Sequence, residues 1–275
     1  MTFPSSGQSI PEDLHASSGK LSRDVQRAFR VFKEWRYKSK KYGTISGTAR
    51  VVCRFVPRLW PPIGKAVTAS YLRRWTNAPG PKVINLGGQA HLKDEWLSAD
   101  IHPQADVYVD CCKTFPWADH SIDAIMLEEV IEHFNYRDGL HVLKECRRIL
   151  KDDGVLRVST PDFFWFAQLP VVSGSNDEDR KRWEFVKREG LLFLNCGNAP
   201  DSAISMAALN QIFLCHSHRF IYTAQALEDQ FKQAGLRAQR STYQDPNSRL
   251  GGMDSHADRF FHPPEMSLFY DAWRM

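Results

Sequence analysis

The stretch from residue 82 to residue 162 constrains the fold most, because short apolar runs alternate there with turns and acidic residues. The runs are Lys82–Leu86, the run closed by Ser98–Asp100, Val107–Asp110, Ile122–Leu127 and Val155–Thr160. A helical pattern with apolar positions from Leu140 to Leu150 precedes the last run, and we expect Asp152–Gly154 to stop it. Apolar runs that alternate with a helical pattern predict a parallel sheet with crossover helices. The sequence therefore predicts an α/β, doubly wound fold.

Polar residues and a glycine follow these runs at the points where the strands should end. They are Gly87, Asp100, Asp110, Glu128 and Ser159. In open parallel sheets, ligands bind beyond the carboxyl ends of the strands. We therefore expect a ligand site at this edge.

The first part of the chain differs in charge from the rest. Basic residues are frequent from Lys20 to Arg74, where the only acids are Asp24 and Glu34, although the whole chain carries a net charge of only +4. Apolar residues from Leu21 to Trp35 recur at helical spacing among these basic residues. We predict that residues 1–78 form a basic helical arm and residues 79–275 the main domain.

Two interpretations of this arm stay open. A basic amphipathic helix attracts anionic surfaces, either a membrane or a nucleic acid. The same charges also suit a solvated face, with the apolar stripe packed on the main domain. Within the arm we expect a break from Tyr42 to Gly47, an apolar segment ended by Pro61-Pro62, and a second short helix from Ala66 to Trp75.

After Thr160 the strand pattern lapses until the end of the chain. Residues 161–219 show helical segments, and we expect an insertion that forms a lid over the carboxyl edge of the sheet. Thr223 is expected to cap a helix that Gly235 ends. Leu236–Thr242 and Ser267–Trp273 read as the strands that complete the sheet.

Composition limits the setting in which this chain works. No apolar run approaches the roughly 20 residues of a membrane span, and the polar start of the chain suggests no secretory signal. The 6 cysteines include no Cys-x-x-Cys pair, which favours a reducing cytoplasm over a disulfide framework. We predict a cytoplasmic protein, with peripheral membrane association through the basic arm left open. Cys196, Cys215, His216 and His218 lack finger-like spacing, so we expect no metal site.

Several motifs, taken in order, resemble a known family. They are Ile84–Gly88, Ala99–Ile101, Phe115–Asp123, Glu128–His133 and Glu145–Lys151. Each motif alone is weak, but their order and spacing resemble the class I S-adenosylmethionine-dependent methyltransferases. The likeness is nearest to a bacterial, type 11-like group found with surface-polysaccharide genes. It covers residues 82–162 well and residues 216–243 more loosely.

The resemblance implies a mostly parallel, Rossmann-like sheet and a set of cofactor-binding residues for S-adenosylmethionine. That set comprises Gly87, Gly88, Gln89, Asp100, Ile101, Asp110, Cys111 and Glu128. Glycine lets the backbone approach the cofactor closely, and a carboxylate such as Asp100 accepts strong hydrogen bonds from ribose hydroxyls. The resemblance assigns Asp110 to the adenine amino group and the Cys111 N–H to a ring nitrogen.

Gln89 departs from the family pattern, which usually carries Gly-x-Gly in the first turn. A side chain at this position narrows the cleft. The departure keeps open the alternative of a non-catalytic adaptor that reuses the fold.

Methyl transfer to a hydroxyl profits from a general base, whereas a neutral amine needs little help. The candidate bases are Glu129, His133, His216 and His218. Glu128 and Glu129 are adjacent, so on a strand only one of them faces the pocket. For each histidine, a structural role is the competing interpretation. Tyr222 and Asp162 are weaker pocket candidates.

We predict an S-adenosylmethionine-dependent methyltransferase that acts on an O or N atom of a small molecule, a sugar or a polysaccharide precursor. The first alternative is an RNA methyltransferase that uses the basic arm. Leu127–Val130 stands where an Asn-Pro-Pro-Tyr-like base-flipping motif would follow the fourth strand, which disfavours a nucleic-acid acceptor. The second alternative is the non-catalytic adaptor. The sequence carries no signature of an oligomeric state.

Overall fold

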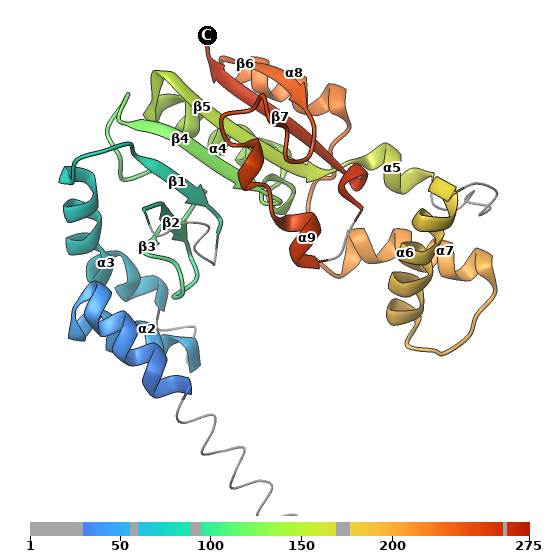
Figure 1. Cartoon of the computed structure of the whole chain (residues 1–275), viewed down its shortest axis with the longest axis horizontal. Helices are drawn as coiled ribbons and strands as arrows, with labels where there is room; N and C mark the ends of the chain where they lie inside the picture. Colours follow the sequence, from blue (N-terminus) through green and yellow to red (C-terminus); the bar gives the residue numbers. More distant parts are fainter. Residues whose placement is uncertain (1–29, 56–59, 89–94, 169–176, 261–262) are drawn as a thin grey trace, which may run out of the picture. The chain divides into compact units, whose positions relative to one another are not determined.

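The computed structural model describes residues 30–55, 60–88, 95–168, 177–260 and 263–275. The chain falls into two compact units, residues 1–68 and residues 69–275 (Figure 1). Among the described residues, none of the helices combines the length and the apolar character that a membrane span needs.

The described part of the first unit is helical. Residues 30–42 form a helix, α2 spans Thr44–Phe55, and α3 (Trp60–Asn77) begins here. The break predicted from Tyr42 to Gly47 is wrong, because only Gly43 interrupts the helices, with a left-handed φ of +91°. Gly47 instead lies inside α2, where an added Cβ would come within 2.6 Å of the Ser39 nitrogen. The two helices therefore cross at a glycine.

Pro61-Pro62 begins a helix and does not end the preceding segment, contrary to the prediction. Both prolines lie in the first turn of α3, where the missing N–H groups have no helical partner in any case. The helix is consequently longer than the predicted Ala66–Trp75.

Two basic side chains of the first unit are buried. Arg50 is 1% exposed, and its guanidinium lies 3.9 Å from the centroid of the Tyr42 ring. Lys38 is 7% exposed and pairs with Glu34 at 3.6 Å. These two charges therefore belong to the internal packing of the helices. The amphipathic pattern predicted from Leu21 lies largely outside the described residues, so its membrane role stays a prediction.

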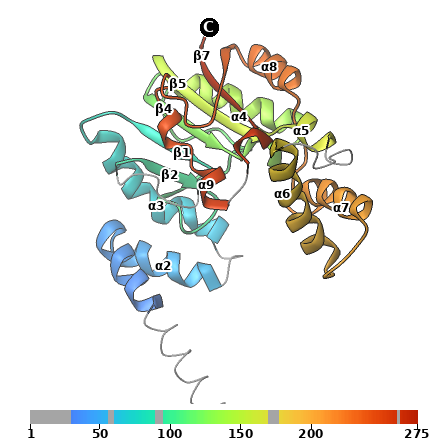
Figure 2. The same ribbon diagram turned by 45° about the vertical axis from the view of Figure 1, so that its right-hand side comes forward.

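The second unit is built on a seven-stranded sheet with the order β3-β2-β1-β4-β5-β7-β6 (Figure 2). The strands are β1 (Val83–Leu86), β2 (Leu97–Asp100), β3 (Val107–Tyr108), β4 (Ile122–Glu128), β5 (Leu150–Pro161), β6 (Leu236–Ser241) and β7 (Ser267–Arg274). β7 is antiparallel to β5 and β6, whereas the pairs from β3 to β5 are all parallel. This order confirms the predicted α/β, doubly wound and mostly parallel fold.

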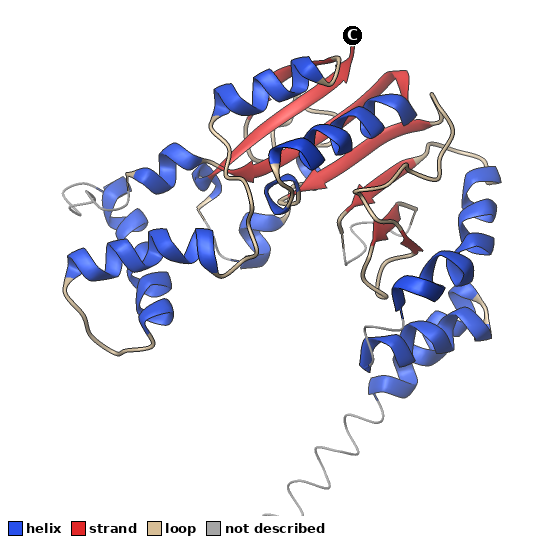
Figure 3. Cartoon of the chain, turned by 180° about the vertical axis from the view of Figure 1, so that it is seen from behind, coloured by secondary structure: helices blue, strands red, loops and turns tan. Residues whose placement is uncertain are grey.

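Helices α4 (Tyr136–Ile149) and α8 (Ala224–Gln233) lie side by side on one face of the sheet (Figure 3). The Asn135 side chain caps α4 by accepting from the Asp138 N–H at 2.9 Å, and Thr223 caps α8 as predicted. The main apolar core fills the space between these helices and the strands.

The helix stop predicted at Asp152–Gly154 is wrong. α4 ends at Ile149, and β5 begins at once with Leu150, which pairs with Ile122 of β4. The pairing then shifts register, so that Val155 faces Ala124. Asp152 and Asp153 therefore lie in the irregular start of β5, where their side chains are exposed to solvent.

Arg157 of β5 is buried and is held by residues from the end of the chain. Its Nε donates to Asp254 Oδ1 at 3.0 Å, and its Nη1 donates to Asp271 Oδ1 at 3.2 Å. Removing one partner of such a buried ion pair is strongly destabilising, because the other charge stays buried without compensation. The network fixes the segment around Asp254 against the sheet.

Residues 161–219 contain α5 (Phe163–Ala167), α6 (Asp177–Leu194) and α7 (Asp201–Leu214), and no strand lies among the described residues of this segment beyond Pro161. α6 and α7 pack against each other (Figure 2). With α5 and Met266 they enclose a second, smaller apolar core. The segment is helical as predicted, and its role as a lid stays a prediction.

Candidate functional site

The turn after β1 accepts only glycine at its first position. Gly87 has a left-handed φ of +77°, and its N–H donates to the Ala99 carbonyl oxygen at 2.8 Å. An added Cβ would lie 2.5 Å from Cγ2 of Val130. The turn after β1 therefore packs directly against the segment that follows β4.

The second position of this turn is equally confined. An added Cβ at Gly88 would lie 2.0 Å from the Asn85 amide nitrogen, and the Gly88 carbonyl oxygen accepts from the Ser98 hydroxyl at 2.9 Å. Gln89, the third predicted cofactor residue, lies outside the described residues. Its effect on the cleft stays a prediction.

Asp100 ends β2 with a half-buried carboxylate. Its Oδ1 accepts from the His102 N–H at 2.8 Å. Burial raises the pKa of Asp100 to about 6, although the N–H groups of His102 and Ile101 oppose the rise. The Ile101 side chain is 58% exposed beside it. A carboxylate in such a place gains from any further hydrogen-bond donor that a ligand brings.

Asp110 lies close to Asp100 because the strand ends are paired. The Val109 N–H donates to the Asp100 carbonyl oxygen at 3.1 Å. Asp110 follows β3, which is shorter than predicted, and its Oδ1 accepts from the Cys112 N–H at 3.0 Å. The Cys111 thiol is buried, and burial, together with the nearby charges, raises its pKa. Two carboxylates and a glycine turn thus lie on adjacent strand ends.

Two aromatic residues of the Phe115–Asp123 motif belong to the core. Phe115 and Trp117 are buried in the main cluster, with ring centroids 6.1 Å apart in an edge-to-face arrangement. Glu145 and Arg148 hold their loop, through the Phe115 N–H at 2.7 Å and the Trp117 carbonyl at 2.9 Å. Phe115 and Trp117 therefore serve the packing of the core.

The two glutamates at the carboxyl end of β4, Glu128 and Glu129, have different surroundings. Glu128 Oε1 accepts from the N–H groups of Ser255 and His256 at 2.6 and 2.9 Å. It thereby anchors the start of α9 (His256–Phe260). The Ser255 hydroxyl also donates to Glu128 Oε2 at 3.2 Å, so both oxygens have partners, and the cofactor role of Glu128 stays a prediction.

Glu129 turns away from this contact. Its φ is +54°, a left-handed value that is unusual for a residue with a side chain, and its N–H donates to the Ser159 carbonyl at 3.0 Å. Its Oε1 atom is buried and has no hydrogen-bond partner in the described structure. Burial raises the pKa of Glu129 to about 7, although the Ser267 and Ser159 hydroxyls oppose the rise.

Glu132 was not among the predicted site residues, yet the structure places it beside Glu129. It is 1% exposed, and its Oε2 accepts from the Thr160 hydroxyl at 3.0 Å. Burial raises its pKa, and the charge of Glu129 raises it further. The sequence signal was its place directly before the candidate base His133, with which it shares the short helical turn Ile131–His133.

Two of the three candidate histidines join Glu132. His218 Nε2 lies 4.0 Å from Glu132 Oε1, and the His133 and His218 ring centroids are 4.9 Å apart. Partial burial lowers the pKa of both imidazoles, that of His218 to about 4. Arg219 and Phe220 donate their N–H groups to the Glu132 carbonyl at 2.8 and 3.1 Å. The loop after α7 is therefore bound to the end of β4.

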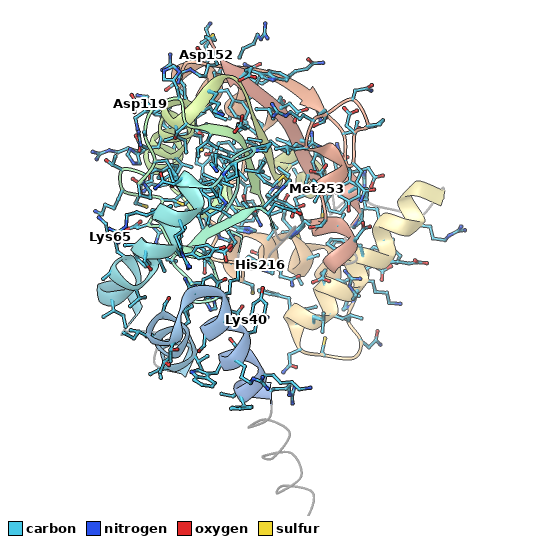
Figure 4. The ribbon with its side chains drawn as sticks, turned by 60° about the vertical axis from the view of Figure 1, so that its left-hand side comes forward. Lys40, Lys65, Asp119, Asp152, His216 and Met253 are labelled. Atoms are coloured by element: carbon cyan, nitrogen blue, oxygen red, sulfur yellow. The ribbon has the colours of Figure 1, made fainter. Side chains whose placement is uncertain are left out.

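His216 is exposed on the same loop, at the edge of this group (labelled in Figure 4). It borders a cavity of about 50 Å³ whose other lining residues include Phe166, Phe185, Ala208 and Met266. The cavity therefore lies between the helices of the predicted lid and the loop that carries His216.

The two weaker candidates have structural roles. Tyr222 is fully buried, and its hydroxyl donates to Gln230 Oε1 at 2.8 Å. Asp162 caps α5 by accepting from the Phe164 N–H at 2.9 Å.

Comparison with known proteins gives one family. A family model described as a methyltransferase domain matches residues 17–240, which is most of the chain. No curated protein matches the chain.

Solved structures are similar in fold at low identity. An S-adenosylmethionine-dependent methyltransferase from Archaeoglobus fulgidus is 12% identical, over 76% of this chain and 92% of its own, with a TM-score of 0.41. A possible histamine N-methyltransferase from Thermotoga maritima is 15% identical, over 81% of this chain and 97% of its own, with a TM-score of 0.39.

Proposed function

Because the chain belongs to the methyltransferase-domain family and is an S-adenosylmethionine-dependent methyltransferase, we propose that it methylates a hydroxyl oxygen of a small molecule, sugar or polysaccharide precursor. The observation that carries this proposal is the buried Oε1 atom of Glu129, which lacks a hydrogen-bond partner among the described residues. An unsatisfied carboxylate oxygen at the carboxyl end of β4 is suited to receive a proton from an acceptor.

The residues at the ends of β1, β2 and β3 fit the cofactor. The half-buried Asp100 carboxylate would accept from the ribose hydroxyls, and Asp110 with the Cys111 N–H would hold the adenine. The left-handed turn at Gly87 keeps side chains away from this edge. When bound, S-adenosylmethionine supplies an electrophilic methyl carbon on its sulfonium.

The base lies next to the cofactor turn through a single contact. Val130 packs where a Gly87 Cβ would be, and Val130 directly follows Glu129 in the chain. Val130 therefore links the proposed cofactor turn, which it contacts at Gly87, to the proposed proton acceptor Glu129, which precedes it in the chain. Positioning of this kind is the main contribution that a protein makes to an in-line displacement.

Glu129 would take the hydroxyl proton as the acceptor oxygen bonds to the methyl carbon and the carbon–sulfur bond breaks, with S-adenosylhomocysteine as the leaving group. Its pKa near 7 leaves it able to accept a proton at neutral pH. A neutral amine needs no such group, which is why a buried carboxylate with one unpaired oxygen favours a hydroxyl acceptor. The sugar class rests on the family likeness and on the helical segment beside His216, which would close over a small polar acceptor.

Calorimetry with S-adenosylmethionine and S-adenosylhomocysteine tests cofactor binding, and mass spectrometry tests transfer to monosaccharides, nucleotide sugars and amines. We expect hydroxyl acceptors to gain one methyl group. Glu129→Gln should lower the rate about 10²- to 10⁴-fold, the usual contribution of a general base.

The matched control is Glu184→Gln, which changes an exposed carboxylate on α6 and should leave the rate unchanged. Methylation of amines alone, or an unchanged rate in Glu129→Gln, would contradict the proposal.

A further inference from the structure

Glu132, His133 and His218 form a compact group that we call the Glu–His cluster. One ligand atom from each residue lies within 4.8 Å of the other two. Glu132 and His133 lie in the short helical turn after β4, and His218 comes from the loop after α7. Residues distant in the chain therefore converge at one point of the sheet edge.

The His218 imidazole is oriented by a backbone group. Its Nδ1 lies 2.6 Å from the Ile212 carbonyl oxygen. A ring nitrogen that donates to a carbonyl carries the proton, so the other nitrogen presents a lone pair. Histidines that bind metals are held in this way by a partner on the second nitrogen.

Glu129 gives a second, independent observation. Its buried Oε1 atom has no hydrogen-bond partner among the described residues, and its carboxylate is near enough to influence Glu132 electrostatically. Two buried carboxylates side by side are unfavourable unless a positive charge compensates them. The Thr160 hydroxyl donates to Glu132 Oε2 at 3.0 Å and thereby fixes the carboxylate through the oxygen that is not paired with His218.

We propose that the Glu–His cluster binds a divalent transition-metal cation through Glu132, His133 and His218, with Glu129 beside it. Mixed imidazole and carboxylate ligands suit manganese, iron, cobalt, nickel or zinc better than calcium. Ligands about 2.1 Å from a metal lie at most about 4.2 Å apart, so the cluster needs only a small contraction to close on the cation.

The proposed site also identifies the acceptor more closely. Three protein ligands leave open positions on a cation, and a hydroxyl oxygen bound there loses its proton more readily. Glu129, whose charge acts on Glu132, would lie close to that position. The acceptor class is therefore an alcohol that can coordinate a cation. This part rests on the methyl transfer proposed above, whereas the cation site itself does not.

The test uses the full chain, stripped with EDTA and titrated by calorimetry with Mn²⁺, Co²⁺ or Zn²⁺ alone, without cofactor. We expect one tightly bound cation per chain. His133→Gln and His218→Gln should each weaken binding at least tenfold. His216→Gln is the matched control, because His216 is exposed on the same loop and lies outside the cluster; its affinity should be unchanged.

Failure of the wild-type chain to bind any of the three cations would overturn the site, as would an equal loss in His216→Gln. His133 is exposed, so its substitution is expected to leave folding intact, and a thermal melt in EDTA checks this. S-adenosylmethionine titration of the same samples separates the two proposals. Cofactor binding without cation binding rejects only the cation site, and cation binding without cofactor binding rejects only the proposed methyl transfer.

Discussion

The two halves of the sheet's carboxyl edge are built differently. In the β1–β3 half, Asp100 and Asp110 accept N–H groups from residues two positions further along the chain. In the β4–β5 half, Glu132 meets a threonine from the neighbouring strand and a histidine from a distant loop. The first half is local in sequence, and the second is assembled by the fold.

The two halves also differ in backbone strain. Glu129 and Ser217 both have left-handed φ values, +54° and +59°, although neither is a glycine. Such conformations each cost about 1–3 kcal/mol and persist where the surrounding structure holds them. The β1–β3 half uses glycine for its left-handed turn and avoids this cost. We infer that the β1–β3 half is a general cofactor edge and that the β4–β5 half is specialised for the acceptor.

The largest expected effect is on cofactor affinity in the β1–β3 half. Asp100→Ala removes a carboxylate that would accept two hydrogen bonds, each worth about 1.5–3 kcal/mol to a charged group. We expect S-adenosylmethionine affinity to fall about 100-fold or more, measured by calorimetry. Asp229→Ala, at an exposed position on α8, is the control and should bind normally. Equal affinity in the two variants would remove Asp100 from the site.

The next effect is on the turn that joins the two halves. Gly87→Ala places a Cβ 2.5 Å from Val130 and strains a left-handed φ. We expect a loss of about 1–3 kcal/mol in the free energy of unfolding, measured by urea denaturation.

Adding Val130→Ala should remove the steric part of this loss and leave the backbone part. Gly197→Ala is the control, because nothing lies within 4 Å of a Cβ there. A Gly87→Ala chain as stable as the wild type would show that the turn adapts, and the link between the halves would be lost.

A third effect follows from the raised pKa of Asp100, about 6 in the folded chain. Below that pH the carboxyl is protonated and loses its capacity to accept. Cofactor affinity should therefore fall about tenfold per pH unit below 6, since one pKa unit corresponds to about 1.4 kcal/mol. Calorimetry from pH 5 to pH 8 measures this.

Asp100→Asn should remove this step. For the unliganded protein the sign is opposite, because a carboxyl whose folded pKa is raised favours folding at low pH and loses that contribution as pH rises towards 6. Affinity that is constant from pH 5 to pH 8 in the wild type would assign the cofactor to a different group.

The smallest expected effect is on cofactor affinity when the β4–β5 half is changed, and it tests whether the two halves act independently. Glu129→Gln should change S-adenosylmethionine affinity by no more than about twofold, which is below about 0.5 kcal/mol. The reason is that the Glu129 carboxylate interacts with Glu132 and with the Ser159 hydroxyl, both of which belong to the β4–β5 half. Calorimetry beside Asp100→Ala gives the comparison. A loss as large as that of Asp100→Ala would mean that the two halves form one binding site.

Sequence patterns predicted the sheet well because burial on parallel strands leaves a continuous apolar signal, as in Ile122–Leu127. They failed where one residue or one turn decided the boundary. Gly43 interrupts the helices alone, Pro61-Pro62 starts α3, and the Asp152–Gly154 segment extends β5. In each case the local residues allow more than one structure, and packing selects among them.

The sequence by itself determined the fold class and the family, because the apolar runs and motifs that indicate them are each formed by residues within a few positions of one another. Only the tertiary structure brought His218 to Glu132 and His133, since the loop after α7 must return to the turn after β4 for the three residues to meet. The prediction of no metal site examined ligand spacing along the chain, and spacing along the chain cannot show a cluster whose members are joined by the fold.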